Sequence, residues 1–283
     1  MTTSRTLAGD PRPILVRPAS GKTGRRVAER PASRGLAVRR GGRSEAIPFD
    51  WDDPATWPAA LHGTRAVYVA YVPDLAVPQA PAALTAFTRE AAAAGVEQIV
   101  LLSGRGEEAA QRCEQIVRDA GPAWTIVRAA WFAQNFSEGE FAGMVSEGVL
   151  SLPLGESVEP FVDLDDVADV AVAALTDPRH RGQTYEVSGP RLLSLADIAA
   201  ELSAVTGQPV TYVPQEPQDF ASALLADGAP APFVELLGYL FELMRDGRNA
   251  WVADGVQRAL GRPPRDFRQF VERAAAGGAW QQA

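Results

Sequence analysis

The segment ILVRPASGKTG, residues 14–24, has the residue types and spacing of a phosphate-binding turn. A short apolar run leads into Gly21 and Gly24 and then into a basic stretch with a helical pattern. In such a turn, backbone N–H groups and the first turn of the helix bind a phosphate group. Pro18 stands where the first glycine belongs, and proline fixes φ at about −65° and has no N–H. The sequence therefore predicts a dinucleotide-type turn that departs from the usual pattern at its first position.

The sequence offers no thiol or metal chemistry beside this turn. Cys113 is the single cysteine, and His62 and His180 are the two histidines, all far apart in the chain. This spacing does not suit a metal site, and one cysteine forms no disulfide within the chain. Cys113 lies in a helical pattern with Ala109 and Ile116 on its face, so we expect a small buried residue and not a nucleophile.

The composition is that of a globular protein acting on small molecules. The chain has 283 residues, 46% hydrophobic and 22% charged, with a net charge of −8. This charge gives no basic footprint for nucleic acid, and no apolar run reaches the roughly 18–20 residues of a membrane span. We expect a cytoplasmic monomer or homodimer. Residues 1–13 lack the apolar run of a secretory signal and are predicted to form a disordered leader.

The turn is predicted to lie in a parallel sheet, because apolar runs alternate with helical patterns in the first half of the chain. Runs such as AVYVAY and QIVLL are continuously apolar, as in strands buried on both faces. The predicted strands are Ile14–Val16, Leu36–Arg39, Ala66–Tyr71, Gln98–Leu102 and Trp124–Arg128. The helical patterns between them cover Thr23–Arg30, Ala80–Ala94 and Glu107–Ala120. Pro31 should end or kink the first helix near Arg30.

The second half reads as a mainly helical lobe. Asp165 or Asp166 is placed to cap one helix, and Ser194 with Asp197 is placed to cap another that Gly207 ends. TYEVSGP and VTYVP are further strand candidates. We predict an α/β protein with a Rossmann-like, doubly wound parallel sheet over 14–150. Residues 151–283 are predicted to form a small C-terminal substrate lobe packed over the carboxyl ends of the strands.

An ordered series of segments resembles the NmrA-like family of atypical short-chain dehydrogenases. Pro18, Gly21 and Gly24 occupy the three glycine positions of the family's G-x-x-G-x-x-G turn. The resemblance runs from Ile14 to the C-terminus. It continues through VRRGGRS, FDWDDPATWPAALHGTRAVYVAY, AGVEQIVLLSG, WTIVRAAWFAQNF, FVDLDDVADVAVAAL and YEVSGPRLLSLADIAAELSAVTG.

The resemblance implies a binding site for NADP(H). No acid ends the second strand; Arg39, Arg40 and Arg43 stand there instead, which favours a 2′-phosphate over the ribose hydroxyls of NAD. For Arg39 and Arg40 we nevertheless expect a solvated basic edge. The residues that the resemblance places along the cofactor are Ala19, Ser20, Gly21, Lys22, Thr23, Gly24, Arg43, Asp50, Trp51, Ala70, Tyr71, Val72 and Ser103.

The catalytic residues are not identified by the resemblance. The related dehydrogenases use a tyrosine with a lysine four residues on, but Lys22 is the single lysine and no Tyr-x-x-x-Lys occurs. Hydride transfer to an electron-poor acceptor, such as a quinone, needs no such donor. Asp163 is an acidic residue for which we expect a structural role. The predicted pocket residues, suited to a flat aromatic or conjugated substrate, are Tyr71, Glu107, Trp131, Phe132, Asn135 and Phe136.

Three functions follow from this sequence. The first is an NADPH-dependent oxidoreductase of a quinone-like or other conjugated small molecule, as in the natural-product tailoring of secondary metabolism. The altered turn also fits a cofactor-independent cyclase, isomerase or coupling enzyme on the same fold. The third is an NADP-sensing regulator, the role for which the family is named, and Pro18 counts most against this one because a sensor needs an intact turn.

Overall fold

The computed structural model describes residues 10–139 and 141–280, which form two compact units. The first unit comprises the residues up to Ala129 together with Leu164–Val187 and Asp254–Arg262. The second comprises Ala130–Asp163, Ser188–Ala253 and the residues from Pro263 onward. Residues 1–9 of the predicted leader lie outside the described residues. The division at residue 150 and the packing of a lobe over the strand ends stay predictions.

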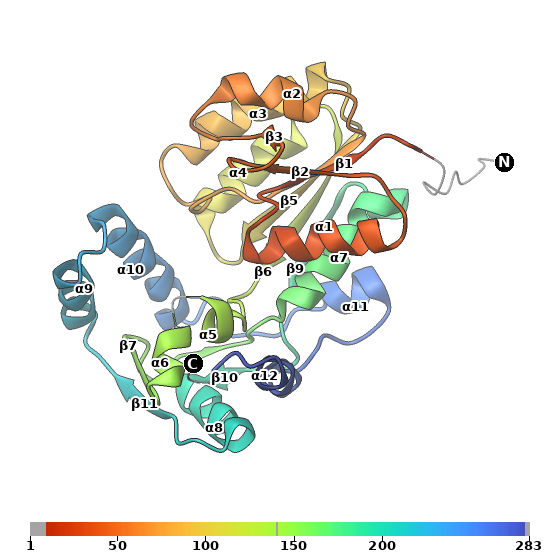
Figure 1. Ribbon diagram of the computed structural model, residues 1–283. Helices are drawn as coiled ribbons and strands as arrows, with labels where there is room; N and C mark the ends of the chain where they lie inside the picture. Colours follow the sequence, from red (N-terminus) through yellow and green to blue (C-terminus); the bar gives the residue numbers. More distant parts are fainter. Residues whose placement is uncertain (1–9, 140, 281–283) are drawn as a thin grey trace. The chain divides into compact units, whose positions relative to one another are not determined.

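A seven-stranded parallel sheet forms the centre of the first unit (Figure 1). Its order is β3-β2-β1-β4-β5-β6-β9, so the chain reverses direction across the sheet between β1 and β4. All its strand pairs are parallel, as predicted from the buried apolar runs. The predicted fold class is therefore confirmed. The strands are β1 (Ile14–Arg17), β2 (Val38–Gly42), β3 (Ile47–Pro48), β4 (Ala66–Val69), β5 (Gln98–Gly104), β6 (Ala123–Ala129) and β9 (Gln183–Val187).

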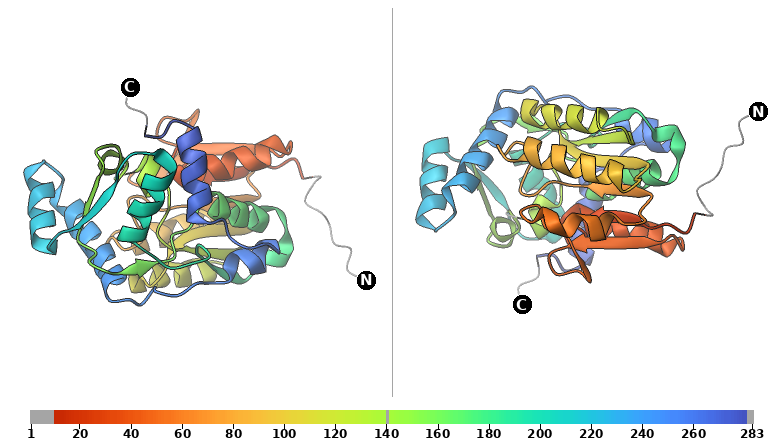
Figure 2. Two further views of the ribbon diagram at one scale, coloured as in Figure 1. Left: turned by 90° about the horizontal axis from the view of Figure 1, so that it is seen from below. Right: turned by 90° about the horizontal axis from the view of Figure 1, so that it is seen from above.

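Helices cover both faces of this sheet. Helices α1 and α7 pack against each other on one face, and α2, α3 and α4 lie side by side on the other (Figures 1 and 2). Apolar side chains such as Leu84 and Phe87 point into the core below α3. The helices of this unit are α1 (Lys22–Ser33), α2 (Trp57–Leu61), α3 (Ala80–Ala93), α4 (Glu108–Arg118), α7 (Leu164–Thr176) and α11 (Gly255–Leu260), with short 3-10 turns at Pro54–Thr56 and Pro178–His180.

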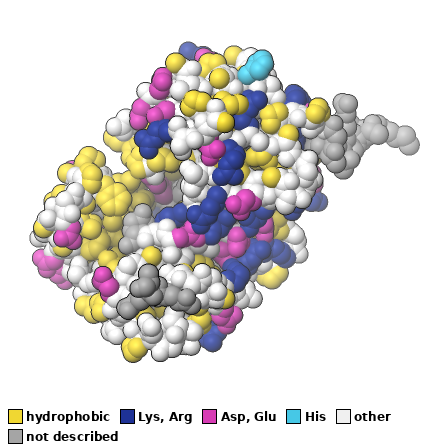
Figure 3. Space-filling model, viewed as in Figure 1, with side chains coloured by type: hydrophobic (Ala, Val, Ile, Leu, Met, Phe, Trp, Pro, Cys, Tyr) yellow, Lys and Arg dark blue, Asp and Glu magenta, His cyan; other side chains and the backbone are white. Residues whose placement is uncertain are grey.

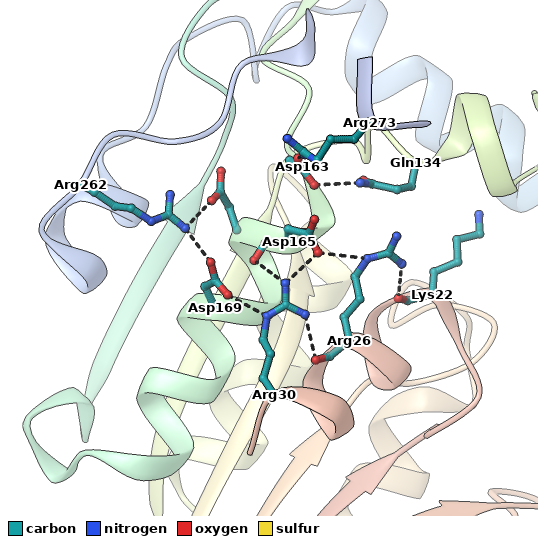
Figure 4. A network of polar contacts seen from close by, with 10 residues as sticks. Lys22, Arg26, Arg30, Gln134, Asp163, Asp165, Asp169, Arg262 and Arg273 are labelled. Carbon is teal, nitrogen blue, oxygen red and sulfur yellow. Dashed lines mark hydrogen bonds and ion pairs between the residues drawn. The ribbon is translucent and has the colours of Figure 1, made fainter. Parts of the chain in front are cut away.

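Pro31 was predicted to end or kink helix α1 near Arg30, and the helix does not end there. It continues through Pro31 to Ser33, because Pro31 falls in the last turn, where its carbonyl accepts hydrogen bonds from the N–H groups of Arg34 and Leu36. Arg30 also holds the helix against α7. Its Nε lies 2.7 Å from Asp169 Oδ1, and its Nη2 lies 2.7 Å from Asp165 Oδ1 (Figure 4). Tertiary ion pairs thus hold α1 in place where its own sequence weakens it.

Asp165 and Asp166 do not precede helix α7 as predicted, since the helix begins at Leu164 and both lie in its first turn. There their negative charges interact favourably with the positive end of the helix dipole. Each also binds an arginine of the same unit: Asp166 Oδ1 lies 2.7 Å from Arg262 Nη2, and Asp165 binds Arg30. In the space-filling view, charged side chains of both signs gather over α1 and α7 (Figure 3).

The second unit is mainly helical, with two small sheets. Phenylalanine side chains such as Phe136, Phe161 and Phe267 pack edge to face in its core. Ser194 and Asp197 form the predicted capping box of α8, which Gly207 ends in the left-handed conformation. Strands β8 and β10 pair antiparallel, and strands β7 and β11 pair parallel. The elements are α5 (Asn135–Glu138), α6 (Ala142–Ser146), β7 (Val149–Leu152), β8 (Val158–Glu159), β10 (Leu193–Ser194), α8 (Leu195–Thr206), β11 (Thr211–Pro214), α9 (Pro217–Ala226), α10 (Ala231–Arg245) and α12 (Phe267–Ala276).

Candidate cofactor and substrate sites

The turn between β1 and α1 keeps an open helix N-terminus. Gly21 is the N-cap residue, no side chain caps the helix, and its first turn contains no acidic residue. Ala19 N–H is bound to the carbonyl of Gly41 at 2.9 Å, which fixes the turn against β2. A Cβ on Gly24 would lie 1.6 Å from the Pro18 carbonyl oxygen, so only glycine fits there. This end of the turn suits a phosphate group, because the N–H groups at a helix N-terminus and the helix dipole both favour an anion.

Arg17 lies at the opposite edge of this turn and is buried, with 6% of its surface exposed. Its guanidinium carbon lies 4.2 Å from the Trp51 ring centroid and 4.5 Å from that of Phe49. Its Nη1 donates to the carbonyl oxygen of Ala70 at 3.1 Å. Burial lowers the pKa of Arg17 to about 9, while Asp50 opposes this shift. The side chain thus remains a cation at neutral pH, placed against two aromatic rings.

The arginines after β1 differ in what they bind. Arg39 Nη1 donates to the carbonyls of Ala60 at 2.7 Å and His62 at 2.6 Å. Arg40 is exposed, with Nε 3.5 Å from Glu45 Oε1. The solvated edge expected for both is wrong for Arg39, which is half-buried because it binds the carbonyl end of α2. Arg43 is exposed.

Asp50, Trp51, Ala70, Tyr71 and Val72 follow β3 and β4, at the carboxyl edge of the sheet. The indole of Trp51 is 6% exposed, and its ring centroid lies 4.8 Å from that of Tyr71. The Asp50 carbonyl accepts a hydrogen bond from the indole N–H of Trp57. Val72 is 52% exposed. The structure therefore brings Asp50, Trp51, Ala70 and Tyr71 together around Arg17.

Ser103, near the end of β5, points its hydroxyl at a buried carboxylate. Its Oγ donates to Glu114 Oε1 at 2.8 Å, and Glu114 on α4 has no exposed surface. Arg128 binds both oxygens of Glu114 through Nε at 2.6 Å and Nη2 at 2.7 Å. The hydrogen bonds that Arg128 donates to the Glu114 carboxylate raise the pKa of Arg128. This cluster ties β5, α4 and β6 together below the strand ends.

Glu107 precedes α4 and is paired with another carboxyl group. Its side chain folds back over Gly104, where a Cβ would lie 1.6 Å from Glu107 Oε1. The Glu107 carboxyl hydrogen-bonds to that of Asp74, in the loop after β4. Burial and then Asp74 raise the pKa of Glu107 well above its ordinary value. Both causes favour the protonated form of Glu107.

The other predicted pocket residues lie in the second unit. Trp131 stacks on Phe241 with ring centroids 5.4 Å apart, and on Phe141 at 6.3 Å. Phe136 is fully buried, and Phe132 pairs with Val162 through backbone. Trp131, Phe132 and Asn135 are half-buried, so each presents part of its surface.

Asp163 belongs to the polar part of the second unit, where it is 1% exposed. Its Oδ1 accepts from Gln134 Nε2 at 2.8 Å, and its Oδ2 binds Arg273 (Figure 4). These contacts agree with the structural role expected for it. A carboxylate with both oxygens engaged holds its neighbours in place.

Sequence reasoning missed Asp74, Glu114 and Phe241. Glu114 has one local signal, because Arg118 follows it at the helical spacing of four and binds it at 3.0 Å. Asp74 follows the strand segment AVYV closely, as a residue at a strand end would. Phe241 lies far along the chain from Trp131, and no local pattern connects the two. Cys113 is buried as predicted, and burial raises its pKa to about 11.

A parallel sheet with this order, a glycine turn after its first strand and helices on both faces define a Rossmann-like dinucleotide-binding class of protein. Residues 19–178 match the NAD(P)H-binding family profile, and residues 109–270 match that of the NmrA-like family. The chain belongs to the NmrA-like family of NAD(P)H-binding proteins.

Two curated relatives are reductases. The chain is 37% identical to NAD(P)H azoreductase from Xenophilus azovorans over 81% of this chain and 82% of that protein. It is 36% identical to (4-alkanoyl-5-oxo-2,5-dihydrofuran-3-yl)methyl phosphate reductase from Streptomyces griseus, over 91% and 96%. The Citrobacter sp. triphenylmethane reductase complexed with NADP(H) shares the fold at 19% identity, with a TM-score of 0.74 over 93% and 99% of the two chains. In the described residues, no helix has the length and apolarity to cross a membrane.

Proposed function

We propose that this protein is an NAD(P)H-dependent oxidoreductase that reduces a conjugated small molecule such as a quinone. The observation that carries this proposal is the uncapped N-terminus of α1, which has no acidic residue in its first turn. The relatives from X. azovorans and S. griseus support it, since both are named reductases.

The residues of the turn fit the phosphate part of a dinucleotide. The N–H groups of Ser20–Thr23 and the dipole of α1 would hold the pyrophosphate. Gly24 lets the chain pass close to Pro18. When bound, the cofactor supplies a hydride. The chain itself supplies the N–H groups that bind the phosphates, and the carboxyl groups of Asp74 and Glu107 stand near the ends of β4 and β5.

The proposed substrate is flat and electron-poor. The ring of Trp131, which stacks with Phe141 and with Phe241, offers a partly exposed aromatic surface to such a molecule. Lys22, the single lysine, belongs to the glycine turn, so no lysine is left to assist a tyrosine in protonating a simple ketone. An acceptor whose reduced form is stable needs less help from an acid. A role in natural-product tailoring fits this substrate class.

One observation favours a second function, a non-redox enzyme on the same fold. Arg17 fills space beside Trp51 and Ala70, two of the residues expected along the cofactor. A cyclase, isomerase or coupling enzyme would need the pocket and not the dinucleotide.

Steady-state oxidation of NADPH with a panel of quinones and azo dyes tests the proposal. Lys22→Glu places an acid in the first turn of α1 and should raise KM for NADPH about tenfold or more, because it repels phosphate. Arg34→Glu makes the same charge change at the exposed far end of α1 and should leave KM nearly unchanged. Absence of NADPH oxidation with every acceptor, together with substrate turnover by cofactor-free protein, would move the assignment to the non-redox function.

A further inference from the structure

The side chain of Arg17 lies where the two halves of a dinucleotide-binding groove meet. In this fold class the pyrophosphate lies on the turn after the first strand, and the adenosine ribose lies beside the end of the second. Arg17 ends β1, and its Cγ lies 3.6 Å from where Gly41 of β2 would carry a Cβ. The guanidinium then reaches Trp51, after β3, and Ala70, after β4. The side chain therefore spans the adenosine side of the sheet edge.

The side chain of Arg17 occupies this space and is buried there. Arg17 is only 6% exposed, with Phe49 and Trp51 against its guanidinium at 4.5 and 4.2 Å. Its Nε has no hydrogen-bond partner within residues 10–139 and 141–280. The Phe49 and Trp51 rings contact each other edge to face, with centroids 5.3 Å apart, and the guanidinium lies against both of them. A purine cannot take the same place while the arginine side chain fills it.

Arg17 is also held from two directions, which argues against a swing toward the pyrophosphate. Its Nη1 donates to the Ala70 carbonyl at 3.1 Å, and its own carbonyl accepts from Ala70 N–H at 2.9 Å. Both its backbone and its side chain are thus bound to the same residue of the neighbouring strand end. The two aromatic rings add cation–π contacts that an outward rotamer would lose.

We infer that Arg17 takes the place of the adenine ring, so that this protein holds its cofactor through the nicotinamide nucleotide and phosphates alone. The inference rests on the proposed reductase function and names the ligand class of that site. Reduced nicotinamide mononucleotide should then serve about as well as NADPH. The adenosine half of NADP should have no site of its own, and the choice between NADPH and NADH should be weak.

The test compares two halves of the cofactor on the full chain. One arm titrates 2′,5′-ADP, the adenosine half of NADP, by calorimetry into the wild type, Arg17→Thr, and Arg17→Thr combined with Pro18→Gly. Arg89→Thr is the control, because it removes an exposed arginine on α3 of the same unit. The other arm measures kcat/KM of the wild type for NADPH and for reduced nicotinamide mononucleotide with one quinone.

We expect no saturable binding of 2′,5′-ADP to the wild type or the Arg89 variant, and binding at least about tenfold tighter to the Arg17 variants. We expect the two kcat/KM values to agree within about threefold. Equal 2′,5′-ADP affinity of wild type and Arg17 variants, or a kcat/KM for NADPH far above that for the mononucleotide, would overturn the inference. If the wild type oxidises neither cofactor, the proposed function fails, and the 2′,5′-ADP arm still decides the place of Arg17.

Discussion

Replacing Glu114 by glutamine should destabilise the first unit strongly while keeping the shape of the side chain. The carboxylate accepts four hydrogen bonds: Ser103 Oγ and Arg128 Nε to Oε1, and Arg128 Nη2 and Arg118 Nη2 to Oε2. Glutamine keeps one acceptor oxygen. Its amide nitrogen faces donors in place of the other oxygen, so two of the four bonds are lost together with the negative charge.

The magnitude follows from burial. Glu114 is fully buried, and removing one member of a buried ion pair costs about 3–5 kcal/mol. Arg118 and Arg128 keep 24% and 18% of their side-chain surface exposed, so water replaces part of what they lose. Arg128 also keeps Glu186 at 2.9 Å. We therefore expect a loss at the lower end, about 3 kcal/mol.

Urea unfolding followed by tryptophan fluorescence measures this loss. Glu108→Gln on the same helix is the matched control; Glu108 is exposed, and its replacement should change the free energy of unfolding by less than about 0.5 kcal/mol. The two units could unfold separately, so far-UV circular dichroism should be followed in parallel. A loss below about 1 kcal/mol for Glu114→Gln would refute the reasoning, since that is the value of an exposed ion pair.

Three further predictions concern single residues. The pKa of Glu107 is raised by burial and by Asp74, so the folded protein binds a proton that the unfolded chain releases, and stability should fall as the pH rises from the ordinary carboxyl range through the raised pKa. Urea unfolding at about pH 5 and pH 8 measures this fall in stability, which Glu107→Gln should remove and the control Glu108→Gln should retain. An equal change of stability with pH in the wild type and in Glu107→Gln would contradict the prediction. Ser194→Ala should cost about 1 kcal/mol in thermal unfolding, because Ser194 Oγ accepts from Asp197 N at 3.1 Å in the capping box. Pro18→Gly alone should leave 2′,5′-ADP binding as absent as in the wild type, because Arg17 still fills the groove; a calorimetric binding signal for this variant would show that the proline, and not the arginine, is the obstacle.

Local signals explain what the sequence predicted well. The capping box of α8 involves residues three apart, and its stop at Gly207 needs a positive φ that glycine adopts freely. The strand segments AVYV and QIVLL are apolar throughout because both faces of the sheet are covered. Their alternation with helices is enough to predict a parallel order.

Features that depend on distant residues could not be predicted. Arg17 binds Ala70, 53 residues away in the chain. The sequence alone therefore did not show whether its guanidinium contacts a phosphate group or aromatic side chains. Glu114 lies in a helical pattern with charged neighbours and resembles a solvated residue until β6 brings Arg128 to it. Helix α1 continues through Pro31, and its Arg30 is bound by Asp165 and Asp169 of α7, which lie more than 130 residues further along the chain. In each case a long-range contact outweighs the local preference.

The glycines of the turn have a packing function that does not depend on a cofactor. A Cβ at Gly24 would lie 1.6 Å from the Pro18 carbonyl oxygen, and one at Gly21 would lie 3.1 Å from Pro18 Cγ. The close passage of α1 over the end of β1 requires glycine at residue 24 with or without a bound phosphate. Retention of Gly21 and Gly24 is therefore weaker evidence for a dinucleotide than the glycine pattern alone suggests. The evidence for a phosphate is the uncapped helix end without acid, and the evidence against a bound adenine is the buried cation of Arg17. These observations concern different parts of one groove, so a cofactor held by its phosphates and without its adenine satisfies both.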